Sequence, residues 1–411
     1  MLPFYLGFLA SLFAILSAVL LFAILLYLLS TERQAPHIRK SETKGREQSQ
    51  DTLVSIIIAA RNEEEKIARC ISSLIAQSYQ NIEILVVDDN STDKTSSIAA
   101  EFEGKDPRVH TISPGAKPQR WVGKSWPCER GFQVSKGELL LFVDADSVFE
   151  PKAVEYSVKC LHYGSIDMLS ISPRVNLTGI WAKATLPLVS AGINLLYPMK
   201  KVNDPKSRRA YVFGTFILVK KSVYAAIGGH EAIRERIVED AAIAQLAKSK
   251  GYKLRVMIGD GLVTTDWEHE FSSIYRGMER VFSDSIRSYG LVSLLDAVLV
   301  FFLGLYPIVF IVGYASYSIF VRNFMVGSNL VSLPLNAGFV ASLMCVLFSL
   351  SMQAKELHIT KAKKIGLTPF LYPIGFCLFI SAIVTSTLKV SGSKSIEWKG
   401  QKFEQKPVAR V

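Results

Sequence analysis

Two aspartates that could bind a metal ion stand one residue apart at the end of a strongly apolar run. The run 139–143 reads Leu-Leu-Leu-Phe-Val, and Asp144 and Asp146 come directly after it. A short all-apolar run predicts a buried strand of a parallel sheet, and such sheets bind ligands at the carboxyl ends of their strands. Paired carboxylates there suit a hard divalent cation that in turn holds phosphate oxygens. We expect Mg²⁺ or Mn²⁺ on Asp144 and Asp146; the alternative is a solvated Asp-Ala-Asp turn.

Polar side chains also follow two other apolar runs, 54–60 and 82–87. Parallel strands end at one edge of a sheet, so we expect these side chains to share one pocket with the two aspartates. Carboxylates in such a pocket accept hydrogen bonds from a base N–H or from ribose hydroxyls, whereas they bind phosphate only through a cation. The sequence contains neither a GxGxxG nor a P-loop signature, which argues against nicotinamide-dependent and kinase-like chemistry. The candidate nucleotide-binding residues of this pocket are Ala60, Asn62, Glu63, Asp88, Asp89, Lys124 and Asp144.

A lysine and an acid pair complete the candidate chemistry. Gly123 lets the backbone approach a ligand, and Lys124 supplies a point charge suited to a diphosphate. The alternative for Lys124 is an ordinary surface lysine. Glu239 and Asp240 precede a helix-like stretch; they either complement the helix dipole or include a general base.

The apolar runs alternate with helix-like segments along the middle of the chain. Further strands are expected at 109–113 and 211–219, and helices at 67–78 and 239–250. Such alternation predicts an α/β domain with a mostly parallel sheet and helices on both faces.

Four long stretches carry no charge: 2–30, 297–321, 330–352 and 369–388. A membrane-spanning helix needs about 20 apolar residues, so we expect one N-terminal and about three C-terminal transmembrane helices. The first stretch lacks a basic start and is long for a signal peptide, which favours an uncleaved anchor. We therefore expect a multi-pass protein of the cell membrane.

Basic residues next to these stretches predict the orientation of the chain. The linker 32–52 and the segment 353–368 are rich in lysine and arginine, so the positive-inside tendency places both, and the domain between the first two spans, in the cytoplasm. Three C-terminal spans would then put the equally basic tail 391–411 outside. Either the tail departs from the rule or one apolar stretch is re-entrant.

The net charge of +11 indicates a membrane partner rather than nucleic acid, because the charges flank the apolar stretches and suit anionic lipid headgroups. The five cysteines show no CxxC pair, so we expect them to have packing roles.

Segment 271–296 mixes aromatic and basic residues and is expected to lie in the membrane interface, whereas segment 181–198 is equally compatible with the interface and with a core helix. The expected organisation is an anchor at 1–31, a linker at 32–52, a catalytic domain at 53–270, interfacial helices at 271–296, spans at 297–390 and a tail at 391–411.

The order of these motifs resembles the family 2 glycosyltransferases, which are inverting enzymes of the Rossmann-like GT-A fold. The resemblance covers about 54–290. In the first half of the matching region it rests on 54–64 with its Asn-Glu turn and on 86–93 with the nucleotide-binding acid pair. Further along, Gly123-Lys124 matches the lysine motif, Asp144 and Asp146 match the DxD motif, and Glu239-Asp240 matches the motif that contains the base. The anchor, the C-terminal spans and the Trp398-Lys399-Gly400 tail are similar to carotenoid (diaponeurosporenoate-type), hopanoid-associated and ceramide-type lipid glycosyltransferases.

The resemblance implies transfer of one sugar from a nucleotide-diphosphate donor, with a UDP-sugar favoured, to a membrane lipid. Asp240, with Glu239 beside it, would be catalytic, and the metal and Lys124 would offset charge on the leaving group. A base is needed for a hydroxyl acceptor but not for a carboxylate or phosphate, so Asp240 favours a hydroxyl lipid. Residues expected on the acceptor or diphosphate side are Gly214, Thr215, Arg276 and Arg280.

Two other functions remain possible at this point. A processive polysaccharide synthase would carry (Q/R)xxRW after the base, whereas the stretch 275–282 keeps the arginine with different spacing and no tryptophan. Ceramide-type enzymes share that motif, so its absence also loosens the ceramide-type assignment. A catalytically idle membrane scaffold would tolerate loss of the acids, yet every acid is present.

Overall fold

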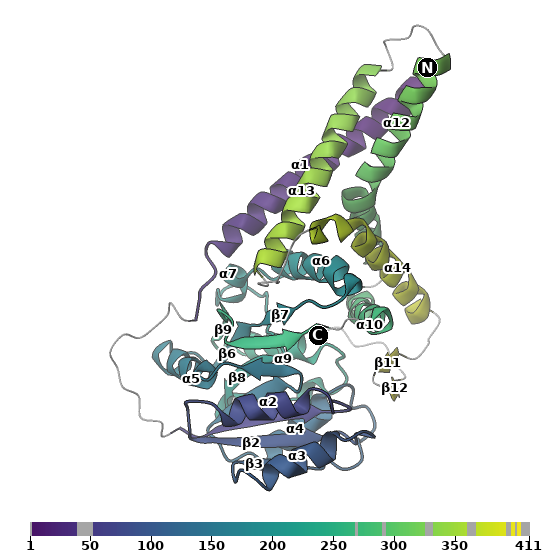
Figure 1. Ribbon diagram of the computed structural model, residues 1–411. Coiled ribbons are helices and arrows are strands. Elements are labelled where there is room, and N and C mark those ends of the chain that lie inside the picture. The colour runs from purple at the N-terminus through teal and green to yellow at the C-terminus, as the bar shows by residue number, and fades with distance from the viewer. Residues whose placement is uncertain are drawn as a thin grey trace.

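The computed structural model describes residues 2–38, 52–267, 270–289, 293–324, 332–359, 367–391, 396–398 and 401–403. An α/β domain lies at one end, and a group of long apolar helices extends away from it (Figure 1). Most of the linker 32–52 and of the tail 391–411 lies outside the described residues.

A seven-stranded sheet forms the centre of the α/β domain. Its strands are β1 (Val54–Ala60), β2 (Ile82–Asp88), β3 (Val109–Ile112), β4 (Leu139–Asp144), β6 (Met168–Ser172), β8 (Phe216–Lys220) and β9 (Leu254–Ile258). They lie in the order β3-β2-β1-β4-β8-β6-β9. Only β8 runs antiparallel to its neighbours, β4 and β6; the other pairs are parallel. The expected mostly parallel sheet is therefore confirmed.

Helices cover both faces of this sheet, which explains why its strands are predominantly apolar. Along β1, Ile56 and Ile58 pack into one core and Ile57 packs into the other. The first core lies under α2 (Ile67–Ile75), α3 (Thr95–Glu103) and α5 (Ala153–Tyr163). The second lies under α4 (Ser125–Val134), α8 (Lys221–Ile227) and α9 (Glu239–Ser249).

A second, three-stranded sheet lies next to the end of β4. It consists of β5 (Ser147–Phe149), β7 (Arg174–Asn176) and β10 (Val263–Asp266). The central strand β10 is antiparallel to β5 and parallel to β7. Because β5 begins one residue after Asp146, this small sheet holds the second aspartate of the pair in place.

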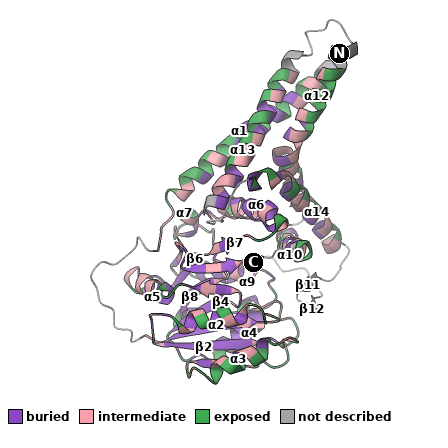
Figure 2. Ribbon diagram, in the orientation of Figure 1, coloured by how far each residue is buried: buried purple, intermediate pink, exposed green. Residues whose placement is uncertain are grey.

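Four helical stretches among the described residues are long and apolar enough to span a membrane: Tyr5–Glu32, Ala297–Ile319, Leu335–Leu357 and Thr368–Val390. They belong to α1 (Leu2–Glu32), α11 (Ser293–Val300) with the π-helical η4 (Phe301–Leu305) and α12 (Tyr306–Phe324), α13 (Ser332–Ile359), and η5 (Thr368–Leu371) with α14 (Tyr372–Ser391). Many of their outward residues are exposed (Figure 2). This association of apolar helices with an α/β domain is the architecture expected from the sequence.

Shorter helices join the two parts: α6 (Ile180–Leu196), α7 (Met199–Val202) and α10 (Phe271–Tyr289). Buried Glu356 of α13 accepts hydrogen bonds from Ser190 (2.5 Å) and Asn194 (3.2 Å) of α6. After α1 the chain also pairs with the edge strand β9, since the backbone N–H of Ile38 donates to the carbonyl of Ile258 at 3.0 Å. The α/β domain is thus attached to the apolar helices at several points.

The predicted strand 211–219 is wrong over its first five residues. In the structure, β8 begins at Phe216, which pairs with Val143 at the point where β4 reaches Asp144. The Phe213 N–H donates to the Ser170 hydroxyl at 2.9 Å instead of to a strand partner. Residues 211–215 therefore precede the strand as irregular chain, with a turn at Gly214 and Thr215 beside Lys124 and Asp240.

Candidate active site

Three neighbouring strands bring their carboxyl ends together at one edge of the sheet. In the register of β1 with β2, Ala60 pairs with Asp88, and in the register of β1 with β4, Ala59 pairs with Asp144. The acid clusters at the ends of β1, β2 and β4 are consequently neighbours, as parallel pairing requires. Asn62, Asp88 and Asp144 thus mark one polar edge.

The turns after β1 and β2 are tied to each other through side chains. Asn62 has a positive φ of 52°, which asparagine tolerates better than most residues. Its side-chain oxygen accepts the Thr92 N–H at 2.9 Å, and the Glu63 N–H donates to the Thr95 hydroxyl at 2.7 Å. Asp88 accepts a hydrogen bond from the Ser91 N–H at 3.2 Å. These hydrogen bonds fix the two turns that border the carboxyl ends of β1 and β2.

Asp89 is buried and forms an ion pair that the sequence did not predict. Its Oδ2 lies 2.7 Å from Nζ of Lys117, which also donates to the carbonyl of Gly123 at 2.9 Å. Oδ1 of Asp89 has no hydrogen-bond partner among the described residues. A buried acceptor of this kind needs a donor, and a base N–H or a ribose hydroxyl would supply one. The signal for Lys117 was its position in the same loop as Gly123 and Lys124.

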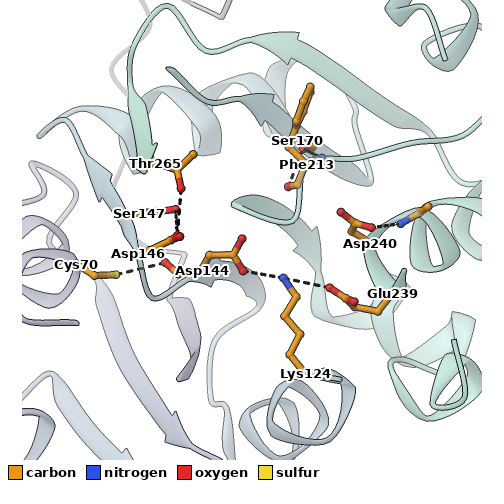
Figure 3. A network of polar contacts seen from close by, with 11 residues as sticks. Cys70, Lys124, Asp144, Asp146, Ser147, Ser170, Phe213, Glu239, Asp240 and Thr265 are labelled. Carbon is orange, nitrogen blue, oxygen red and sulfur yellow. Dashed lines mark hydrogen bonds and ion pairs between the residues drawn. The ribbon is translucent and has the colours of Figure 1, made fainter. Parts of the chain in front are cut away.

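Asp144 and Asp146 point into the same region from the end of β4 (Figure 3). Oδ1 of Asp144 lies 2.7 Å from Nζ of Lys124, whereas Oδ1 of Asp146 accepts a hydrogen bond from the Thr265 hydroxyl at 3.1 Å. Withdrawal from water, followed by the charge of Asp144, raises the pKa of Asp146. Two carboxylates thus crowd together at a place where a cation would relieve their repulsion.

Lys124 lies between two acids from different parts of the chain. Its Nζ is 2.7 Å from Asp144 and 3.1 Å from Oε1 of Glu239, the first residue of α9. Withdrawal from water disfavours the charge on Lys124, but the two carboxylates outweigh this effect and raise its pKa. Gly123 before it has a φ of 62°, a backbone conformation that glycine adopts without strain. The ammonium group is therefore positively charged and directed at the acid cluster.

Asp240 lies beside Glu239 in the first turn of α9, on the far side of Lys124 from Asp144 (Figure 3). Its Oδ1 accepts a hydrogen bond from the Ala241 N–H at 2.7 Å. Withdrawal from water and the charge of Glu239 raise its pKa from 3.8 to about 6, although Lys124 acts in the opposite direction. A carboxylate with such a pKa is suited to accept a proton near neutral pH.

The remaining predicted residues divide into two groups. A Cβ on Gly214 would lie 3.0 Å from Nζ of Lys124 and 3.3 Å from Oδ2 of Asp240, so Gly214 lies directly against both. The buried hydroxyl of Thr215 has no hydrogen-bond partner among the described residues. On α10, exposed Arg276 donates to Ser272 and Ser273 of its own helix, and no contact between α10 arginines and the acid cluster is present among the described residues.

Residues 55–228 match the family model described as glycosyl transferase family 2. The match begins in β1, contains Asp144, Asp146 and Lys124, and ends before α9. Residues 55–228 are a family 2 glycosyltransferase domain. Glu239 and Asp240 reach its acid cluster from outside the matched region.

Relatives of this glycosyltransferase extend beyond that domain. The 4,4'-diaponeurosporenoate glycosyltransferase of Staphylococcus aureus (strain MRSA252) is 26% identical over 357 residues, which are 85% of this chain and 88% of the relative. The enzyme of the same name from strain bovine RF122 is 25% identical, and the alignment covers the same percentages of the two chains. The similarity therefore includes much of the apolar helices as well as the α/β domain.

The fold also matches a solved glycosyltransferase structure. The mannosyltransferase PcManGT from Pyrobaculum calidifontis, in complex with GDP-Man and Mn²⁺, superimposes with a TM-score of 0.51 over 93% of this chain and 99% of that one. Sequence identity is 16%, so this likeness concerns the fold alone. It confirms the GT-A-like architecture of this glycosyltransferase.

The acid pair has the chemistry of a magnesium or manganese site. Among the described residues, no group of three or more His, Cys, Asp and Glu side chains is arranged to hold a metal ion. Mg²⁺ is commonly bound in proteins by one or two carboxylates together with substrate phosphates and water. Asp144 and Asp146, which offer only oxygen ligands, fit this pattern.

Proposed function

We propose that this glycosyltransferase moves a single sugar from a nucleotide-diphosphate sugar to a membrane lipid, with inversion at the anomeric carbon. The observation that carries the proposal is the arrangement around Lys124: one ammonium group between Asp144 and Glu239, with Asp240 next to it. This places a positive charge and a proton acceptor on the same small group of side chains. Both are needed when a hydroxyl displaces a diphosphate.

In this mechanism Asp240 takes the proton of the acceptor hydroxyl while its oxygen attacks the anomeric carbon. The bond from that carbon to the diphosphate breaks, and its electron pair leaves with the nucleoside diphosphate. Lys124 stabilises the negative charge that develops there. Asp144 and Asp146 would hold Mg²⁺ or Mn²⁺, which supplies further positive charge to the leaving group. Attack from the face opposite the diphosphate inverts the configuration.

The nucleoside would bind at the carboxyl ends of β1 and β2. The buried Oδ1 of Asp89 offers an acceptor for a base or ribose donor. Asp88, Asn62, Glu63 and Ala60 form the rim around it. A UDP-sugar is our preferred donor. The solved mannosyltransferase of similar fold holds GDP-Man and Mn²⁺, which supports a nucleotide sugar with a divalent cation here.

The acceptor is proposed to be an apolar lipid of the carotenoid type. The Staphylococcus aureus relatives are named for 4,4'-diaponeurosporenoate, and the similarity spans most of both chains. That name denotes a carboxylate, which would attack without a base. A hydroxyl-bearing lipid is our first choice because Asp240 has a raised pKa, and a carboxylate-bearing lipid is the second candidate.

We place the active site on the cytoplasmic side, where the positive-inside tendency puts the basic linker 32–52. A processive synthase is disfavoured because the stretch 275–282 lacks its motif. A single added sugar is accordingly expected.

Membranes containing the protein, incubated with radiolabelled UDP-sugars and lipid extract, test this proposal. We expect label in the organic phase on a lipid heavier by one sugar, in an amount that rises with donor while its mass stays constant. Membranes with the Asp146→Asn variant are the control for other transferases. A water-soluble product whose length grows with donor would show that the enzyme is processive, and no transfer from any nucleotide sugar would refute the donor class.

A further inference from the structure

Two apolar helices, α1 and α13, lie side by side and run in the same direction (Figure 1). At one end, a Cβ on Gly7 would lie 3.3 Å from the side chain of Leu335. At the other end, Nζ of Lys355 lies 3.3 Å from Oε2 of Glu32. That second end also carries Glu356, which bonds to α6. Hence α13, like α1, ends next to the α/β domain.

Helix α14 begins at this same level and does not return along the bundle. The preceding η5 contacts both α13 and α6. Gly375 then lies against α6, since a Cβ there would be 2.2 Å from the carbonyl oxygen of Ala184. In Figure 1, α14 diverges from α1, α12 and α13 and runs towards α10.

The far end of α14 is bound to α10 by a row of polar contacts. Nζ of Lys389 lies 2.8 Å from both carboxylate oxygens of Glu279. The Ser386 hydroxyl donates to the Glu279 carbonyl at 3.2 Å, and the Tyr275 hydroxyl lies 2.8 Å from that of Ser381 and 3.0 Å from that of Thr385. Since α10 follows the β10 strand of the α/β domain closely, both ends of α14 lie on the side of that domain.

Another face of η5 and α14 is largely apolar and exposed. Its exposed residues recur every three or four positions, the spacing of a single helix face. The apolar members of this row, which we call the α14 stripe, are Leu367, Phe370, Ile374, Cys377, Val384 and Leu388. The row also contains the exposed Ser381, which bonds to Tyr275 of α10. Leu367 and Leu388, near its two ends, are 79% and 66% exposed. Apolar surface is therefore left uncovered along the whole length of η5 and α14.

Lipid is the partner that fits the α14 stripe. The helices α1 and α12, which lie near the start of α14, carry exposed apolar residues as well (Figure 2). The chain on either side of α14 is basic, with Lys361, Lys363 and Lys364 before it and Lys394 and Lys399 after it. Basic residues on both sides suit a single surface of anionic headgroups.

We propose that α14 does not cross the membrane but lies along the leaflet nearest the α/β domain, with the α14 stripe in lipid. The chain then crosses three times, through α1, the α11–α12 segment and α13. The basic tail 391–411 lies on the same side as the α/β domain, in agreement with the positive-inside tendency. This inference is independent of the reaction that the enzyme catalyses.

Single cysteine reporters distinguish this topology from one with four crossings. The background is Cys377→Ser, which removes the exposed native thiol, and the reporters are Ser96→Cys in the α/β domain, Ser328→Cys between α12 and α13, and Gln405→Cys in the tail. Ser96 is exposed, whereas the neighbouring Thr95 is buried and would not react.

With a membrane-impermeant maleimide added to intact cells, we expect labelling at position 328 only, and labelling at 96 and 405 after permeabilisation. Labelling at 405 together with 328 would overturn the proposal. Labelling at 96 and 405 but not at 328 would support the placement of α14 and would instead refute the cytoplasmic active site. If a variant fails to insert, a C-terminal epitope tag on the unaltered chain gives the same answer by its protection from external protease.

Proximity of the two helices supplies an independent measurement. The pair Glu279→Cys and Lys389→Cys should be joined in membranes by a bifunctional maleimide that spans about the length of the two side chains it replaces, whose ends lie 2.8 Å apart. The matched pair Glu279→Cys and Ile374→Cys should not, because Ile374 is exposed and lies fifteen residues, or about 22 Å of helix, before Lys389. Equal cross-linking of both pairs, or none in the first pair of an inserted chain, would contradict the structure at this end of α14.

Discussion

Replacing Asp240 by asparagine removes the proposed base while it changes little else. Oδ1 of Asp240 accepts the Ala241 N–H at 2.7 Å, and the asparagine oxygen can keep that hydrogen bond. The second carboxylate oxygen, next to Gly214 and Lys124, becomes an amide nitrogen that cannot accept a proton. The variant therefore separates proton transfer from the local structure of α9.

We expect kcat to fall by about 10²–10⁴-fold, the usual contribution of a general base. This corresponds to about 3–5 kcal/mol of transition-state stabilisation at 1.36 kcal/mol per tenfold. Donor affinity should change little, because Lys124 retains its partners Asp144 and Glu239. A loss of donor affinity with kcat preserved would instead make Asp240 a binding residue.

The pH dependence of the wild-type enzyme follows from the raised pKa of Asp240. The base must be ionised, so activity is present above its pKa and is lost as pH falls through it. With a pKa of about 6, kcat/KM should fall about tenfold from its plateau by pH 5. An aspartate at the ordinary value of 3.8 would still be mostly ionised at that pH.

The assay is initial-rate transfer of labelled sugar to extracted lipid between pH 5 and 8. Glu231→Gln, which removes an exposed acid of the same segment, is the control and should match the wild type. A flat profile down to pH 5 with an active Asp240→Asn variant would refute the base. That result would favour the carboxylate-bearing acceptor, which attacks without losing a proton.

Further expected outcomes concern the metal, the lysine and the glycine. Asp146→Ala should abolish transfer while the protein still inserts, and full wild-type activity in a strong chelator would refute the metal role of this residue. Lys124→Met should lower kcat by about 10²-fold or more, since it removes the positive charge that stabilises the leaving group. An unchanged kcat would show that Lys124 does not have this role. Gly214→Ala should reduce kcat on the order of tenfold, less than the about 10²-fold cost of a 1 Å misplacement, because its Cβ would press on Lys124 and Asp240. Gly277→Ala on α10, where a Cβ meets nothing within 4 Å, is the matched control.

Local patterns were sufficient to predict the strands and the acids at their ends. A strand buried on both faces is mostly apolar, so β1, β2 and β4 were visible as largely apolar runs that stop at Ala60, Asp88 and Asp144. Parallel pairing then requires these ends to be neighbours, and the register confirms it. The apolar helices were predictable for a similar reason, because a bilayer demands a long uncharged stretch.

Contacts between distant segments were decided only by the tertiary structure. The pairing of Lys117 with Asp89 and of Thr265 with Asp146 depends on where a loop and a second sheet lie, and neither side chain has a distinctive local pattern. The same holds for α14. Its composition equals that of a spanning helix, whereas its direction follows from the pairing of Lys389 with Glu279 on α10. Sequence periodicity reports which face of an element is buried, and only the packing of the whole chain determines what covers that face.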